Sequence, residues 1–196
     1  MSSIKLQFDR EKIIKLMDAV VDRTFRLDLT WDWPCGVGFY GITRAAEAAG
    51  NQSYTERLSS WVDEYLTIGL PAMTVNTSAM GHTLLYLYQK TGKPRFLEPL
   101  KDILNWLQTK AARFEDGVLQ HIVSSNNDFP EQAWADTLFM AAYLMLRSGV
   151  EFNEPLLIDD AMNQYYWHIK YLQDPSTGLW YHGYNNIEKN HMSGFF

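Results

Sequence analysis

Hydrophobic and polar residues alternate with the period of an α-helix along most of the chain. Residues 9–26 place charged side chains on one face and six apolar side chains on another: Ile13, Ile14, Met17, Val20, Val21 and Phe25. Further stretches of this kind predict helices at about 36–49, 53–68, 76–91, 94–112, 130–148 and 154–173. The pattern therefore predicts an almost entirely helical chain, with boundaries defined to within several residues.

Three of the predicted helices end in the same kind of junction. Each closes at a glycine, Gly50, Gly92 or Gly149, where a helix end favours a left-handed residue. An aromatic residue follows a few positions on: Tyr54, Phe96 and Phe152. The glycines are 42 (92 − 50) and 57 (149 − 92) residues apart, which suits an array of helical hairpins and is too irregular for a strict solenoid.

The two helices of each hairpin differ in polarity. The helix before the glycine, as in residues 36–49, is apolar on nearly every face, whereas the helix after it, as in residues 53–68, is amphipathic. A helix that is apolar all round is buried all round, and an amphipathic helix keeps one side in water. The alternation predicts an inner and an outer layer, as in an α/α barrel. A compact helical bundle is the alternative that periodicity leaves open.

Two short segments break the helical pattern. Residues 116–123 (DGVLQHIV) and 177–184 (TGLWYHGY) combine a turn glycine with β-branched or aromatic residues. This composition predicts short extended strands or loops. Each segment comes before a buried helix, or before the place where the next one would start, so we expect both to gather at one mouth of the barrel.

Composition narrows the classes of function. Aromatic residues make up 14% of the chain, enough for a heavily packed core or for a groove lined with rings. The chain is long enough for a single domain, residues 1–196. A net charge of −6 disfavours nucleic-acid binding, which needs a basic surface.

The sequence also bears on compartment and on metals. No stretch approaches the roughly 20 apolar residues of a membrane helix, and the charged N-terminus lacks the apolar run of a signal peptide. We therefore expect no membrane association and a cytoplasmic location. The single cysteine, Cys35, excludes an internal disulfide and a multi-cysteine metal site. No His, Asp or Glu pair at ligand spacing lies at the predicted mouth, so no metal or other cofactor is expected.

Four segments together resemble one enzyme family. They are WDWPCGVGFYGITRAAEAAG (31–50), VNTSAMGHTLLYLYQKTG (75–92), QAWADTLFMAAYLML (132–146) and DPSTGLWYHGYN (174–185). In order and spacing they resemble the family 105 glycoside hydrolases, the unsaturated rhamnogalacturonyl hydrolases. The resemblance implies an all-α fold, a six-hairpin α/α toroid. This chain would supply roughly its first seven helices, with short extended hairpin loops.

The resemblance also implies a reaction. These enzymes remove the 4,5-unsaturated uronic acid that polysaccharide lyases leave at the non-reducing end of pectin-type oligosaccharides. The C4–C5 double bond is hydrated, and the resulting hemiketal opens and releases the rest of the oligosaccharide. One aspartate is expected to protonate the enol ether and then to help activate water. In this sequence that residue is Asp136.

The residues around Asp136 agree with this role without requiring it. Asp136 lies near the start of a very apolar helix, predicted to begin around Pro130. Burial favours the protonated form of a carboxyl group, which suits a general acid, and a helix N-terminus acts in the opposite direction. Taken alone, the sequence favours an aspartate that binds backbone or a neighbouring ring. The resemblance favours catalysis.

Six further residues are candidates for substrate binding: Trp31, Trp33, Asn76, His121, Trp134 and His182. His182 occupies the family's histidine position and would donate a hydrogen bond to the sugar or its carboxylate. The two tryptophans before the first inner helix would stack on sugar rings. His121 and Trp134 rest only on their place near the mouth. For each of these side chains, plain packing is the alternative.

Two other polar groups are interpreted structurally. His82 lies inside a buried helix and is predicted to be a core histidine with its hydrogen bonds satisfied. The carboxylates Asp159 and Asp160 lie on an amphipathic outer helix and are predicted to form a solvated face.

The chain departs from the family pattern in two respects. Some relatives have a second aspartate where this chain has Asn76, which can bind a hydroxyl but cannot share acid–base work. Family members are also nearly twice as long, and their next motif, which supplies an arginine for the uronate carboxylate, would begin after Phe196. We therefore expect an incomplete barrel, lacking its C-terminal helices, with apolar flanks on its open side. The chain would then form homo-oligomers through that side, or it would be a fragment of a longer natural protein.

Three functions remain open at this point. The first is a hydrolase that binds unsaturated uronide oligosaccharides. The second is a truncated, inactive sugar-binding or scaffold module of the same fold. The third is another α/α-barrel enzyme, such as a sugar epimerase with paired histidines, for which only His121 and His182 fall near the mouth.

Overall fold

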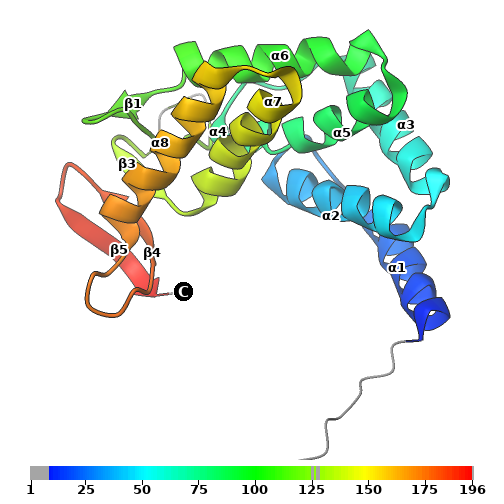
Figure 1. Ribbon diagram of the computed structural model, residues 1–196, viewed down its shortest axis with the longest axis horizontal. Coiled ribbons are helices and arrows are strands. Elements are labelled where there is room, and N and C mark those ends of the chain that lie inside the picture. Colours follow the sequence, from blue (N-terminus) through cyan, green and yellow to red (C-terminus); the bar gives the residue numbers. More distant parts are fainter. Residues whose placement is uncertain (1–8, 125, 127–128, 196) are drawn as a thin grey trace, which may run out of the picture.

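The computed structural model describes residues 9–195, except 125, 127 and 128 (Figure 1). Its helices are α1 (Arg10–Thr24), α2 (Trp33–Ala49), α3 (Gln52–Ile68), α4 (Val75–Ser78), α5 (Gly81–Thr91), α6 (Pro94–Thr109), the π-helical turn η1 (Leu138–Tyr143), α7 (Leu144–Phe152) and α8 (Pro155–Leu172). Its strands are β1 (Arg113–Phe114), β2 (Val118–Leu119), β3 (Gln132–Trp134), β4 (Tyr181–Asn185) and β5 (Asn190–Phe195). All seven predicted helices are present, and the one predicted at 76–91 is divided into α4 and α5.

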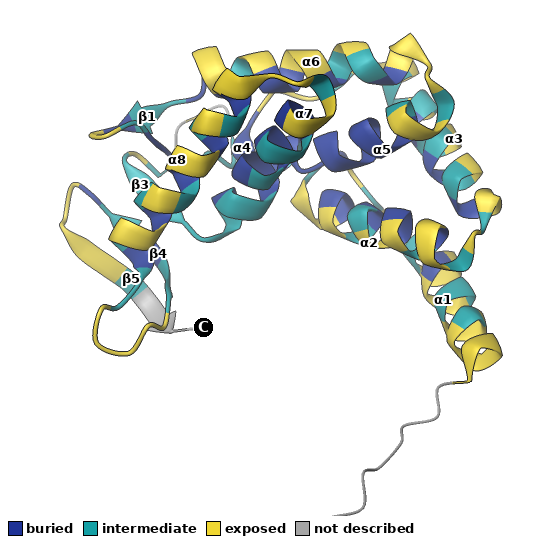
Figure 2. Cartoon of the chain, in the orientation of Figure 1, coloured by how far each residue is buried: buried dark blue, intermediate teal, exposed yellow. Residues whose placement is uncertain are grey.

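The helices form an arch of hairpins (Figure 1). α2 pairs with α3, α5 with α6, and α7 with α8, while α1 packs beside α2. The inner helices α2, α5 and η1–α7 contact one another in turn. Every residue of α5 from Gly81 to Leu87 is buried, whereas α6 and α8 expose their outer sides (Figure 2). The predicted inner and outer layers are therefore confirmed.

The glycine junctions were predicted correctly at two of the three positions. Gly50 and Gly92 end α2 and α5 in the left-handed conformation, each with φ of 65°. The prediction for Gly149 was wrong, because this residue lies inside α7 and Asn153, with φ of 54°, closes the helix. A Cβ at Gly149 would lie 2.7 Å from Cγ1 of Ile158. The glycine is therefore needed for the close approach of α7 to α8.

Two further glycines bring the inner helices close together near their N-terminal ends. A Cβ added to Gly36 of α2 would lie 2.5 Å from Cβ of Ala79 and 2.7 Å from its carbonyl carbon. A Cβ on Gly81 would collide with the side chain of Leu144, at the start of α7. Both contacts are closer than two side-chain-bearing helices can approach, so the absence of a side chain sets the spacing of the inner layer.

Two small antiparallel sheets lie against α8. One pairs β1 with β2, and the other has the order β3-β4-β5. A small core made of Phe114, Val118, Ala133 and Leu172 fills the space between these strands and α8. The extended segments predicted around β2 and β4 are confirmed.

The strand β3 was missed, because residues 132–134 fall inside the helix predicted at 130–148. That helix does not begin at Pro130: Glu131 has φ of 52°, and β3 follows it directly. β3 is held by pairing with β4, about 50 residues further along the chain. Such a partner is invisible to a local pattern, and the apolar run from Ala133 onward resembles a helix whatever its backbone does.

The helices α1 and α8 expose apolar side chains on their surfaces. On α1 they are Ile13, Leu16 and Val20, at the helical spacing of three and four residues. On α8 they are Met162, Tyr166 and Ile169, with the same spacing. Figure 2 shows exposed stretches along both helices. Across the described ranges, no helix combines the length and apolar character needed to cross a membrane.

Gly36→Ala is expected to destabilise the fold by about 1–3 kcal/mol, because the new Cβ meets backbone atoms of Ala79. Gly41→Ala in the same helix is the matched control, since nothing lies within 4 Å of that position. It should be neutral or stabilise by about 0.5–1 kcal/mol through helix propensity. Urea unfolding followed by circular dichroism measures both variants. Equal free energies of unfolding would show that the contact at Gly36 is not tight.

Candidate active site

Three distant segments of the chain meet around β3. The backbone N–H of His121 donates to the carbonyl of Gln132 at 2.8 Å on one side. On the other side Trp134 pairs with Gly183 of β4, and the N–H of Ala135 donates to the carbonyl of His182 at 2.9 Å. β3 therefore lies between the segment of His121 and the strand of His182, and the chain leaving β3 carries Asp136.

The indole of Trp134 contacts both imidazoles. Its ring is stacked on that of His121, with centroids 4.4 Å apart and planes within 7°. The ring of His182 is tilted against it, at 5.1 Å and 58°. The indole N–H donates to Oε1 of Gln132 at 2.9 Å, which fixes the orientation of the ring in its plane. One face of Trp134 is thus covered by protein.

Asp136 lies beside His182 at the surface of this cluster. Its Oδ2 is 3.5 Å from Nε2 of His182. The side chain of Asp136 is 36% exposed and that of His182 is 31% exposed, so both can be reached by a solute. The arrangement provides a carboxyl group and an imidazole that together can give, take or hold a proton at one point of the surface.

His121 is the buried member of the cluster. Its Nδ1 is 3.0 Å from Oγ1 of Thr137, a residue that the sequence reasoning did not single out although it follows Asp136 directly. Burial lowers the pKa of His121 to about 4, and the nearby charge of Asp136 opposes this shift. At neutral pH the imidazole is therefore uncharged, and it serves as a hydrogen-bonding group and a stacking surface.

Side chains of α8 hold the hairpin that leads into His121. The buried amide of Gln164 accepts from the N–H of Leu119 at 2.8 Å and donates to the carbonyl of Gly117 at 3.0 Å. Arg113 forms a two-pronged ion pair with Asp160, at 2.8 and 2.7 Å. The prediction of a solvated face was therefore wrong for Asp160, whose charge is used inside the fold, while Asp159 is exposed.

Asn76 lies next to the cluster through its backbone. It is the second residue of α4, where the N–H groups of Val75 and Asn76 point at the carbonyl of Ile122, at 3.0 and 3.4 Å. Ile122 directly follows His121 in the chain. The side-chain Oδ1 of Asn76 is buried and accepts no hydrogen bond within the described residues. The residue is only 6% exposed, and its role in substrate binding stays a prediction.

A family model described as Glycosyl Hydrolase Family 88 matches residues 7–195. The chain belongs to glycosyl hydrolase family 88. It is 45% identical over 193 residues to the unsaturated rhamnogalacturonyl hydrolase YesR of Bacillus subtilis (strain 168). That match covers 98% of this chain and 56% of the relative.

Solved structures agree with this assignment. Possible members of the GH105 family from Salmonella enterica subsp. enterica serovar Paratyphi A and from Klebsiella pneumoniae subsp. pneumoniae match at TM-scores of 0.87 and 0.88, each at 26% identity. They cover 96% of this chain, which spans 55% and 56% of theirs. The α-1,6-mannanase GH76A of Salegentibacter sp. HEL1_6, at 16% identity and a TM-score of 0.73, shares the fold alone.

These matches confirm the resemblance to family 105 and the all-α fold as part of an α/α toroid. This family 88 chain spans just over half the length of the relatives it matches.

The two candidate tryptophans of the family 88 chain differ in position. Trp31 is only 4% exposed and its ring is packed against Trp61 and Tyr65 of α3. It is a core residue, so the expectation that it stacks on sugar does not hold. Trp33 is 44% exposed at the first turn of α2, and its ring remains available for stacking.

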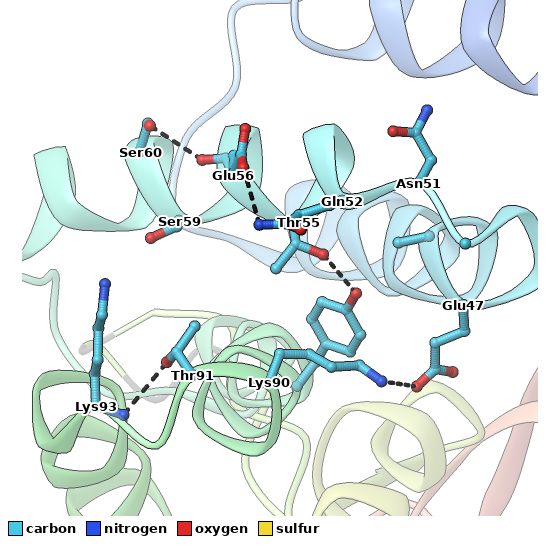
Figure 3. A pocket seen from close by; sticks show the side chains of 13 residues that line it. Glu47, Asn51, Gln52, Thr55, Glu56, Ser59, Ser60, Lys90, Thr91 and Lys93 are labelled. Carbon is cyan, nitrogen blue, oxygen red and sulfur yellow. Dashed lines mark hydrogen bonds and ion pairs between the residues drawn. The ribbon is translucent and has the colours of Figure 1, made fainter.

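A cavity lies elsewhere, at the C-terminal ends of α2 and α5 (Figure 3). It has a volume of about 740 Å³. Its polar side chains bind one another: Thr55 with Tyr86 at 2.7 Å, Lys90 with Glu47 at 3.3 Å, and Gln52 with Glu56 at 3.1 Å. The Asp136 cluster is instead an open surface at the other end of the inner layer.

The low pKa of His121 makes stability depend on pH. A histidine in the unfolded chain takes up a proton near pH 6.5, whereas His121 in the folded protein does so only near pH 4. The stability that the folded protein has above pH 6.5 is therefore lost progressively as the pH falls toward 4. The loss from this group between pH 7 and pH 5 should be about 2 kcal/mol. His121→Gln should lose less on the same change, by about that amount. Urea unfolding of both proteins at the two pH values tests this, and equal losses would contradict a neutral His121.

Proposed function

We propose that this chain carries the acid and the sugar-binding surface of an unsaturated uronyl hydrolase. The substrate would be a 4,5-unsaturated uronic acid at the non-reducing end of a lyase-generated, pectin-type oligosaccharide. The observation that carries the proposal is the accessible Asp136 beside His182 and Trp134, in a family 88 chain that is 45% identical to an unsaturated rhamnogalacturonyl hydrolase.

In the proposed reaction Asp136, in its protonated form, gives its proton to C4 of the enol ether. Positive charge then develops at C5 and is shared with the ring oxygen. Water adds to C5 and returns a proton to the Asp136 carboxylate, which acts as the base in this step. The product is a hemiketal at C5, which opens and releases the rest of the oligosaccharide. One carboxyl group can serve both steps because the proton it gives to C4 in the first step is replaced by a proton from water in the second.

The neighbouring side chains would bind the sugar. His182, 3.5 Å from Asp136, would donate a hydrogen bond to a hydroxyl or to the uronate carboxylate. Trp134 is stacked on His121 and also packed against Phe129, so a sugar ring would contact only the part of the indole that these rings leave exposed. Trp33, exposed at the start of α2, offers a second ring. Asn76 would contribute an amide where some relatives have a carboxylate.

The charges of the substrate and of this chain indicate what the rest of the toroid would have to supply. The substrate is an anion, the chain has a net charge of −6, and His121 is neutral. A cation that binds the uronate would lower the cost of bringing the two together. We propose that it comes from the part of the toroid that lies against the open side of the arch, provided by further helices or by another copy of the chain.

The proposed acid is tested by incubating the folded chain with a lyase-generated disaccharide and following the absorbance of its C4–C5 double bond. The expected result is a decay that falls by at least about 100-fold in Asp136→Asn, because the proton donor is removed. Asp159→Asn is the matched control, since it makes the same change of charge on an exposed carboxylate of α8. A decay that survives in Asp136→Asn would refute the assignment.

A binding module without catalysis is the second candidate, because the exposed ring of Trp33 and the accessible imidazole of His182 can bind a sugar without any proton transfer. Calorimetric titration with the same disaccharide separates the two. Binding that is weakened by Trp134→Ala, together with a flat absorbance trace, would support the binding role over hydrolysis.

A further inference from the structure

The chain widens into a π-helical turn directly after the proposed acid. η1 begins at Leu138, two residues beyond Asp136 (138 − 136), and ends where α7 begins. π-helical turns are rare, occur mostly as single turns inside α-helices, and are frequent at functional sites. Because such a turn holds more residues than an α-helical one, it sets the rotation of the residues before it relative to the helix after it.

A buried histidine of the neighbouring inner helix binds this turn. Nε2 of His82, on α5, lies 2.9 Å from the carbonyl oxygen of Phe139 in η1. On the other side of the imidazole, Nδ1 lies 2.9 Å from Nη1 of Arg147 on α7. His82 thus contacts the inner helix that follows Asp136 at two points. The sequence prediction of a satisfied core histidine is confirmed, and its partners are now known.

The chemistry of the two partners fixes the state of the imidazole. A guanidinium can only donate hydrogen bonds, so Nδ1 of His82 must accept. A carbonyl oxygen can only accept, so Nε2 must carry the proton. His82 is therefore a neutral imidazole of one tautomer. Burial, the main cause, lowers its pKa to about 3, so that this state persists throughout the neutral range.

The position of the ring is also fixed by packing. The imidazole is completely buried, and its centroid lies 4.7 Å from that of Phe139, 5.3 Å from Tyr143 and 5.3 Å from Tyr40. Gly81, the residue before His82, allows the close approach of α5 to Leu144. The donor is thus held rigidly against the carbonyl that it binds.

We propose that His82 is a positioning residue for Asp136, acting through the carbonyl of Phe139 to hold the π-helical turn. The inference rests on the proposed function, in which Asp136 is the acid. Without the N–H of His82, the carbonyl of Phe139 in the π-helical turn loses its hydrogen-bond donor. An α-helical turn would not need this donor. If the π-helical turn relaxed into an α-helical turn with one residue fewer, the chain before the turn would rotate by about 100° around the helix axis. It would also shift by about 1.5 Å along that axis. That movement would take the carboxyl group of Asp136 away from His182.

The test compares His82→Leu, which removes both hydrogen bonds at similar volume, with His82→Gln, whose amide can donate to Phe139 and accept from Arg147. Leu87→Ala is the control for a general loss of stability, because Leu87 is equally buried on the same helix and lies outside the cluster. For the folded protein, we expect kcat on the unsaturated disaccharide to fall about 10- to 100-fold in His82→Leu with little change in KM, as misplacement of a catalytic group predicts. His82→Gln should restore most of kcat, and Leu87→Ala should leave it unchanged.

A second readout needs no turnover. The ring nitrogen signals of His182, recorded by NMR at pH 7, report on the neighbouring Asp136. The chemical shifts of these signals should change in His82→Leu and stay the same in His82→Gln and Leu87→Ala. Unmoved His182 signals in His82→Leu would overturn the positioning role, whatever the turnover. If the wild-type chain hydrates no uronide while the signals move as expected, the proposed reaction fails and the role of His82 in placing Asp136 stands.

Discussion

The pairing of β3 on both of its edges is the constraint on which the candidate site depends. Three short backbone contacts, from His121 to Gln132, from Trp134 to Gly183 and from Ala135 to His182, bring together residues up to 62 positions apart (183 − 121). No helix of the arch does this directly. The helices provide a rigid frame, and a three-residue strand at its edge decides which side chains meet. The catalytic geometry proposed for Asp136 therefore depends on a small sheet in a protein that is otherwise helical.

The sequence predicted the helical frame well, because its signals are local. The apolar stripes fall on the observed helices, and Gly50 and Gly92 close α2 and α5 with the left-handed backbone that glycine adopts easily. Gly149 looked the same in the sequence and serves a different purpose, since its lack of a side chain admits Ile158. A glycine needed for backbone freedom and a glycine needed for space cannot be told apart without knowing what lies opposite.

The site was predicted in part, and largely through the resemblance. The structure brings Asp136, His182, Trp134 and His121 into one cluster, and it removes Trp31, which the aromatic residues of α3 enclose. Thr137, Gln164 and Asp160 act on the cluster or on the hairpin beneath it, and they carry no signal in the sequence. An aspartate on an amphipathic helix is interpreted as solvated unless its partner, here Arg113, is known to lie opposite. Partners of this kind are long-range facts, and a single sequence does not contain them.

The inner helices α2 and α5 are packed differently at their two ends. Gly36 meets Ala79 near the start of α2 and Gly81 meets Leu144 at the start of α5, whereas a cavity of about 740 Å³ lies at the C-terminal ends of both helices. The tight end depends on two positions that have no side chain. A larger side chain at the C-terminal end can enter the cavity, whereas one added methyl group at Gly36 or Gly81 must push its neighbour away. Changes of sequence are therefore accommodated more easily at the end of these two helices that lies away from Asp136.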